Sequence, residues 1–328
     1  MTEATNEYAN PRIERGVCRA DAHSGKVQLD PVKLAWVGSM LVLGTVGSAL
    51  TVSSDALILF VVFTGTTLCF GHSLGMHRRF IHRSYDCPRW FEYLTVHLGV
   101  LVGLAGPFGM LRTHDLRDWA QRQANCHSYF SHEEVWWRDF YWQLFCSIRL
   151  ENPPSIEIEP EIANDCVFGV MEKTWMLQQV PWALLFFGIG GWSWVFWGIC
   201  SRVSVSILGH WLIGHFAHNT GHRDWHIDGA AAQGFNVPFA ALLTMGESWH
   251  NNHHAFPGSA RLGLEPGQWD PGWWVLSALE KIGLVSKIVT PAVLPTRPEL
   301  VRLDAAPGGA GSRTTVSGAN HFAPQSMI

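Results

Sequence analysis

The stretch Gly246-Glu-Ser-Trp-His-Asn-Asn-His-His-Ala-Phe-Pro257 sets the interpretation of this chain. It places His250, His253 and His254 within five residues. On a helix, residues three and four positions apart share a face, so these rings would lie together. Neutral imidazole is the commonest transition-metal ligand near neutral pH. Surface histidines would explain the stretch too, but the flanking aromatic residues favour a buried metal site.

The composition of the chain points to a membrane. Its 328 residues include 17 tryptophans and 17 histidines, and only 15% are charged. Tryptophan favours the bilayer interface, whereas a mean hydropathy of +0.07 keeps much of the chain outside lipid. A net charge of −4 gives no electrostatic case for nucleic acid. The seven cysteines form no C-x-x-C pair, which favours reduced thiols facing a cytosol.

Long uncharged segments predict four membrane-spanning helices. Residues 34–54 and 56–76 are each long enough to cross a hydrocarbon core of ~30 Å, with a short turn between them. Two more uncharged segments are separated only by Arg202, and a Gly188–Gly191 turn divides them into spans at about 175–190 and 193–215. Segment 93–111 is uncharged but rich in glycine, so we expect a re-entrant or packed helix there.

The charges around these spans predict their orientation. Arginines 78, 79, 83 and 89 follow the second span, and the loop of the first hairpin has none. By the positive-inside rule, both ends of that hairpin are cytoplasmic. We therefore predict an all-α integral membrane protein with four transmembrane helices and a cytoplasmic helical cap. The membrane domain is expected to cover 34–290, between a polar tail over 1–33 and a disordered tail over 291–328.

Three further segments carry histidines near the predicted cytoplasmic face. They are His77-Arg-Arg-Phe-Ile-His82, Gln123-Ala-Asn-Cys126-His127 and His215-Phe-Ala-His218. With Gly75–Tyr85, Trp211–Gly221 and Gly246–Pro257, the chain resembles the integral-membrane fatty acid desaturases, most closely the acyl-CoA Δ9-desaturase-like branch. The resemblance covers roughly 34–290.

This resemblance implies a non-haem di-iron centre that uses O₂ to introduce a double bond into a fatty acyl-CoA or a membrane lipid. Electrons would come from a separate ferredoxin-like or small haem protein, because no haem motif or cysteine cluster is apparent. Matched position by position, the implied ligands are His77, His82, His127, His218, His250, His253 and His254. His215 is expected to replace a family asparagine that is Gly214 here.

The second histidine box departs from the family pattern His-Arg-x-His-His. Gln123 and Cys126 stand where two ligands are expected, and amide and thiolate groups suit an O₂-activating iron poorly. Six other histidines could compensate: His72, His114, His132, His210, His222 and His226. His114 lies about 13 Å along a helix from Gln123. A related lipid hydroxylase, or a non-catalytic desaturase-like protein, therefore stays open.

Three arginines could bind the substrate head group, namely Arg78, Arg79 and Arg122. They are explained first as positive-inside residues that orient the protein. The compact chain without an endoplasmic-reticulum retention signal favours a bacterial inner membrane.

Overall fold

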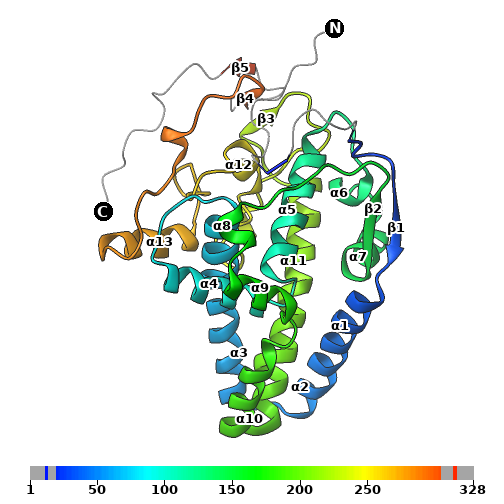
Figure 1. Cartoon of the computed structure of the whole chain (residues 1–328), viewed down its shortest axis with the longest axis vertical. Coiled ribbons are helices and arrows are strands. Elements are labelled where there is room, and N and C mark those ends of the chain that lie inside the picture. The colour runs from blue at the N-terminus through cyan, green and yellow to red at the C-terminus, as the bar shows by residue number, and fades with distance from the viewer. Residues whose placement is uncertain (1–11, 14–19, 304–312, 316–328) are drawn as a thin grey trace.

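The computed structural model describes residues 12–13, 20–303 and 313–315 (Figure 1). Long helices form the lower half of the molecule in this view, and short helices, loops and strands form a cap above them. The remaining residues of the two predicted tails, 1–11, 14–19, 304–312 and 316–328, lie outside the described structure.

Two long apolar helices form the first hairpin. The first runs over Pro31–Leu50, and Asp30 caps it by accepting hydrogen bonds from the first backbone N–H groups. The second runs over Ser54–Ile81, and Ser53 caps it in the same way. Their parts are α1 (Pro31–Val42), η1 (Leu43–Gly47), α2 (Ser48–Leu50), α3 (Ser54–Thr66) and η2 (Thr67–Ile81).

The third long apolar helix doubles back on itself. It covers Gln179–Asn219, as α10 (Gln179–Val195), η3 (Phe196–Ser201) and α11 (Arg202–Asn219). Gly191 breaks the helix with φ 61° and ψ −153°. Gln179 and Arg202 hydrogen-bond at 2.6 Å, although a straight helix would separate them by roughly 34 Å. Among the described residues, three helices are therefore long and apolar enough to cross a membrane, and the last consists of two antiparallel arms.

The segment predicted as re-entrant forms two helices joined by a buried turn. These are α4 (Arg89–Leu101) and α5 (Pro107–Arg122), and Gly103 makes the turn with φ 89°. The end of α4 is packed among the long helices, with Leu101 against Phe63 and Phe186. Arg202 supplies a donor there, because its guanidinium hydrogen-bonds the Leu101 carbonyl at 2.6 Å.

Glycines allow α4 to approach η2 closely. A Cβ added to Gly75 would lie 2.5 Å from the backbone of Thr95, and one added to Gly71 would lie 2.4 Å from the backbone of Leu98. Backbone atoms cannot move aside as a flexible side chain can, so α4 would have to shift. This contact holds the part of η2 that leads up to His77. It also ties the cap to the long helices.

We expect Gly75→Ala to destabilise the protein by about 1–3 kcal/mol, the usual cost of overpacking. Thermal unfolding of the detergent-purified protein would measure this as a lower melting temperature. The matched control is Gly65→Ala on the same long helix, where an added Cβ meets nothing within 4 Å. That control should be neutral or slightly stabilising, and equal melting temperatures for the two variants would contradict the packing argument.

The cap combines short helices with two small sheets in the described part of the chain. β1 (Gly25–Leu29) pairs antiparallel with β2 (Cys146–Leu150), and the second sheet has the order β3 (Trp225–Ile227), β4 (Leu300–Leu303), β5 (Arg313–Thr315). The fold is thus mostly helical, and the strands include parts of both predicted tails. The cap helices are α6 (Ser128–Ser131), α7 (Trp136–Phe145), α8 (Pro160–Ala163), α9 (Cys166–Lys173), η4 (Pro238–Ala240), α12 (His250–Ala255), α13 (Pro271–Lys281) and η5 (Pro291–Val293).

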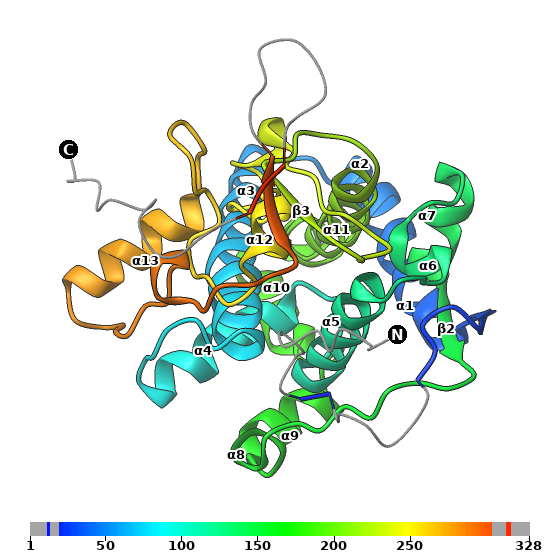
Figure 2. The ribbon, with the colours of Figure 1, turned by 90° about the horizontal axis from the view of Figure 1, so that it is seen from above.

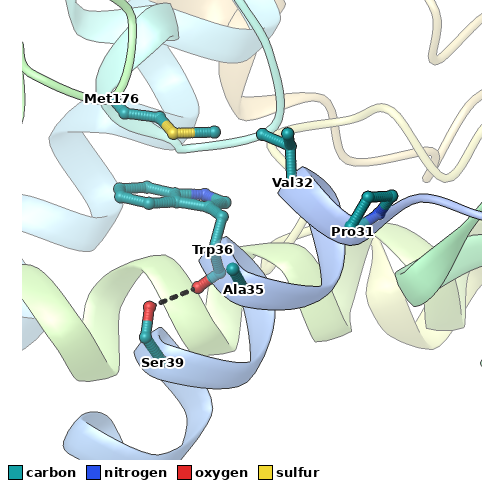
Figure 3. A pocket seen from close by; sticks show the side chains of 6 residues that line it. All are labelled: Pro31, Val32, Ala35, Trp36, Ser39 and Met176. Atoms are coloured by element: carbon teal, nitrogen blue, oxygen red, sulfur yellow. Dashed lines mark hydrogen bonds between the residues drawn. The ribbon is translucent and has the colours of Figure 1, made fainter.

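An open apolar groove of about 460 Å³ lies along α1. Figure 3 shows its lining, with the Trp36 ring lying below Met176. The Trp36 indole donates to the Gly103 carbonyl at 2.9 Å and meets Trp175 edge to face. The lining residues are Pro31, Val32, Ala35, Trp36, Ser39 and Met176. They offer no titratable group, so the chemistry must lie elsewhere.

Candidate metal centre

Four histidines form a first cluster at the upper end of η2. His77 and His82 come from the end of this helix, His114 from α5 and His253 from α12, and one ring nitrogen of each lies within 4.8 Å of the others. The Nε2 atoms of His82 and His114 are 3.3 Å apart. The rings of His77 and His253 have centroids 4.6 Å apart. Three segments far apart in sequence thus meet at one point, and α12, which supplies His253, lies near the middle of the view in Figure 2.

Three histidines form a second cluster on the other side of α12. His218, near the end of α11, faces His250 and His254. The His250 Nε2 atom lies 3.1 Å from that of His218 and 3.0 Å from that of His254. Gln121 of α5 adds its amide nitrogen, 3.0 Å from His218 Nε2. The short helix α12 therefore contributes to both clusters, with His253 to the first and its two other histidines to the second.

A third group, His132, Asp139 and His215, supports the second cluster. Both histidines place Nδ1 3.0 Å from Asp139 Oδ2, and the Trp211 indole donates to the same oxygen at 2.9 Å. This carboxylate is fully buried and already satisfied by donors, so the group forms a hydrogen-bond network. The His132 ring stacks on His218, with centroids 5.5 Å apart and planes 7° apart. His215 thus lies in this network and does not join His218 in the second cluster.

The two clusters fit a transition metal. Two imidazole nitrogens bound at ~2.1 Å to one tetrahedral ion lie roughly 3.4 Å apart, close to the Nε2 separations found here. Burial lowers the pKa of the His82, His253 and His254 rings well below its ordinary value, and that of His250 to about 4. Neutral imidazole is the form that binds metal. A set of ligands made only of imidazoles suits zinc, copper, nickel or iron.

Hydrogen bonds hold α12 at both ends. At its start, the Asn236 side-chain oxygen accepts from the backbone of Asn251 at 3.1 Å. At its end, Arg297 donates to the carbonyls of His254 and Ala255 at 3.0 and 2.8 Å. The asparagines between the histidines serve the same purpose, since the Asn252 amide donates to the Leu262 carbonyl at 2.7 Å. A helix of only six residues needs such partners to keep three histidines in place.

The three residues predicted as the second box lie apart from both clusters in the described structure. The Gln123 amide donates to the Trp119 carbonyl at 3.0 Å. Cys126 packs in an apolar cluster of the cap. His127 precedes α6 and accepts from the Tyr129 N–H at 3.1 Å. The departures from the family pattern at Gln123 and Cys126 therefore do not touch the histidine clusters.

In place of the predicted second-box residues, two residues within helix α5 contact the histidine clusters. His114 and Gln121 are seven residues apart, which places them two turns apart on the same face of the helix. His114 joins the first cluster, and Gln121 contacts His218 in the second. The buried positions of α5 are 107, 110, 111, 115, 120 and 121, and only the structure shows which side of this helix faces the clusters.

The three arginines considered for head-group binding are all paired with carboxylates. Arg78 is fully buried and bonds Asp270 at 2.8 Å. Arg79 lies 3.1 Å from Glu92. Arg122 lies 3.2 Å from Asp118, one helical turn earlier on α5. In this structure their charges hold the cap together.

Fold and site together define a protein with helices apolar enough to cross a membrane and, at one end of them, two adjacent histidine clusters that could each hold a metal ion. No family model matches the chain. It is 32% identical over 233 residues to the sn-1 stearoyl-lipid 9-desaturase of Anabaena variabilis, across 71% of this chain and 82% of that protein. It is 28% identical to the sn-2 palmitoyl-lipid 9-desaturase of Nostoc sp. (strain 36), across 67% and 76%. It is 30% identical to the acyl-CoA 5-desaturase AL21 of Anemone leveillei, across 68% of each.

The chain belongs to the family of acyl-lipid and acyl-CoA fatty acid desaturases, as the resemblance of its histidine segments predicted. It is therefore an oxidoreductase of lipid metabolism. Membership implies iron, a fatty acyl substrate, O₂ and association with a membrane.

Proposed function

We propose that the protein is an O₂-dependent fatty acyl desaturase whose two histidine clusters each hold one iron ion. The observation that carries this proposal is the arrangement on α12, which gives His253 to the first cluster and His250 and His254 to the second. The His250 and His253 rings have centroids only 5.8 Å apart, so two ions would be close neighbours. Two adjacent metal positions suit a reaction that removes two hydrogens.

The two histidine clusters would each hold one ion. His77, His82, His114 and His253 would hold one ion, and His218, His250 and His254 the other. When bound, iron supplies with O₂ the oxidising power needed to remove hydrogen from an unactivated acyl chain. Imidazole resists oxidation better than thiolate, which fits a site built from histidines. The buried network around Asp139 keeps the His132 ring against His218 and so maintains the second cluster.

We propose four membrane crossings with the metal centre on the cytoplasmic side. The turn at Gly191 supports the count, because it divides the third apolar helix into two arms. The first cluster lies at the end of the helix over Ser54–Ile81 and the second lies near the end of α11, so both clusters are at the same end of the long helices. The arginines after Ile81 support a cytoplasmic face. A bacterial inner membrane remains our proposal for the compartment.

For the substrate and the electron donor, we propose only the class of molecule. Relatives are named for acyl groups at the sn-1 and sn-2 positions of lipids and on CoA, so we propose an acyl-lipid or acyl-CoA substrate. We propose a separate ferredoxin-like or small haem protein as the donor. The hydroxylase and non-catalytic alternatives lose their basis, because Gln123 and Cys126 lie outside the clusters.

The test is expression in a host that lacks the corresponding double bond, together with a competent electron donor. Gas chromatography with mass spectrometry should find a new monounsaturated acyl chain, absent without O₂. His253→Ala should reduce this product below detection, since it removes a nitrogen from the first cluster. Hydroxylated lipid as the sole product would favour the hydroxylase, and an unchanged lipid profile from iron-loaded protein would overturn the proposal.

A further inference from the structure

The first cluster is joined to a carboxylate that no histidine pattern predicts. Glu247 precedes the third histidine box, and its Oε2 atom lies 2.6 Å from His77 Nδ1. Its other oxygen accepts a hydrogen bond of 2.5 Å from the Ser73 hydroxyl, one turn below His77 on η2. Both partners of the short contact are largely enclosed, with side-chain exposures of 11% for His77 and 12% for Glu247.

The position of Glu247 is itself fixed by its surroundings. Arg78 Nε lies 3.5 Å from Glu247, and the same guanidinium bonds Asp270 at 2.8 Å. Asp270 also accepts from the backbone of Leu262 at 2.8 Å. Gly246 lets these groups meet, because its φ is 93° and an added Cβ would lie 2.2 Å from Asp270 Oδ1. The carboxylate is therefore held in place independently of His77.

This contact determines which nitrogen of His77 faces the cluster. A carboxylate oxygen 2.6 Å from Nδ1 favours the proton on that nitrogen, because two atoms that carry only lone pairs repel each other at this distance. The Nε2 lone pair then remains for a metal. A histidine that donates to a carboxylate is also a more basic ligand, and such partners typically change metal affinity 10–100-fold.

The second cluster has a weaker counterpart. His218 places its Nδ1 3.3 Å from the Gln233 backbone carbonyl, a neutral and more distant acceptor. The two metal positions thus differ in the groups behind their ligands. One has a full negative charge 2.6 Å from a ligand's ring nitrogen, and the other has a peptide dipole.

We propose that Glu247 is a positioning residue, which fixes the tautomer of His77 and makes the first cluster the tighter metal site. This inference rests on the proposed function, because it assumes a metal in each cluster. Glu247 acts on the metal only through His77. Its effect should therefore appear in the metal affinity and the absorption spectrum of the first cluster alone.

The experiment titrates metal-free, detergent-purified full-length protein with Co²⁺, whose visible absorption reports the ligands. His218→Ala, which damages the second cluster, serves as the background in which the first cluster is measured alone. Adding Glu247→Gln should weaken Co²⁺ binding there about 10–100-fold and shift its absorption bands. In the background of His114→Ala, which damages the first cluster instead, the same substitution should leave Co²⁺ binding unchanged.

Two controls separate positioning from a merely structural role. Asp270→Asn loosens Arg78 and, through it, the position of Glu247, so it should lower the melting temperature of the metal-free protein and weaken Co²⁺ binding less than Glu247→Gln does. Glu134→Gln makes the same chemical change on the cap surface, at a carboxylate 3.4 Å from Arg138, and should change neither quantity. A Glu247→Gln protein that only melts earlier, with unchanged Co²⁺ affinity, would overturn the inference. Wild-type protein that binds no Co²⁺ would instead overturn the proposed function.

Discussion

Replacing His114 with alanine should remove one metal ion and abolish desaturation. The first cluster would fall from four histidines to three, and His82 would lose the nitrogen that lies 3.3 Å from its own. The three remaining rings, those of His77, His82 and His253, come from only two segments, so the metal would lose every ligand from α5. Iron per chain, measured by plasma emission spectroscopy on purified protein, should fall from about two to about one.

The matched control for this prediction is His127→Ala. His127 occupies the position that the histidine pattern assigns to a ligand, yet its Nδ1 accepts from the backbone of Tyr129. This variant should keep its iron and its activity, with a stability loss of about 1 kcal/mol from the lost cap. Iron loss on His127→Ala with full retention on His114→Ala would contradict the assignment of His114 to the first cluster.

Replacing Arg202 with methionine should prevent stable folding in the membrane. The guanidinium donates to the Gly198 and Leu101 carbonyls and to the Gln179 side chain, at 2.6 to 2.8 Å. All three acceptors lie among apolar helices, where each unsatisfied polar group costs several kcal/mol. We expect loss of most of the protein from the membrane fraction, and a melting temperature at least 10 °C lower in what remains.

A lysine at position 202 separates charge from hydrogen bonding. It keeps the charge but can satisfy fewer of the three acceptors, so Arg202→Lys should lie between wild type and Arg202→Met. Arg138→Met on the cap surface is the control, since that side chain is half exposed and should cost less than 1 kcal/mol. Normal yield and melting temperature for Arg202→Met would mean that the carbonyl end of α4 finds other donors.

The long helices could be predicted from composition alone, because a bilayer demands uncharged segments of a certain length. Residues 34–54 and 56–76 were predicted as spans, and Pro31–Leu50 and Ser54–Ile81 are apolar helices of spanning length. The Gly188–Gly191 turn was also predicted, and Gly191 breaks the third helix. Hydropathy could not distinguish a re-entrant helix from a short pair, since α4 and α5 owe their meeting to Gly103 and Arg202.

The candidate site could be predicted in part. Spacing along the chain brought out His250, His253 and His254, because these histidines share one short helix. It gave His114 only as one of six histidines that could compensate, because spacing cannot show that the fold brings His114 to His253 from more than a hundred residues away. The pattern of the second box drew attention to Gln123 and Cys126, which come at and after the end of α5. Only the packing of α5 decides which of its residues face the metal centre.

The hydrogen bonds from Arg297 to the end of α12 have a consequence for biosynthesis. Among the described residues, every long apolar helix precedes Arg297 in the chain, so all of them are synthesised before this residue. The metal-binding helix is therefore completed last, after insertion has finished. We therefore expect the two histidine clusters to reach their final geometry only after residue 297 has been made. Proteolysis just before residue 297 would return the inserted enzyme to that immature condition.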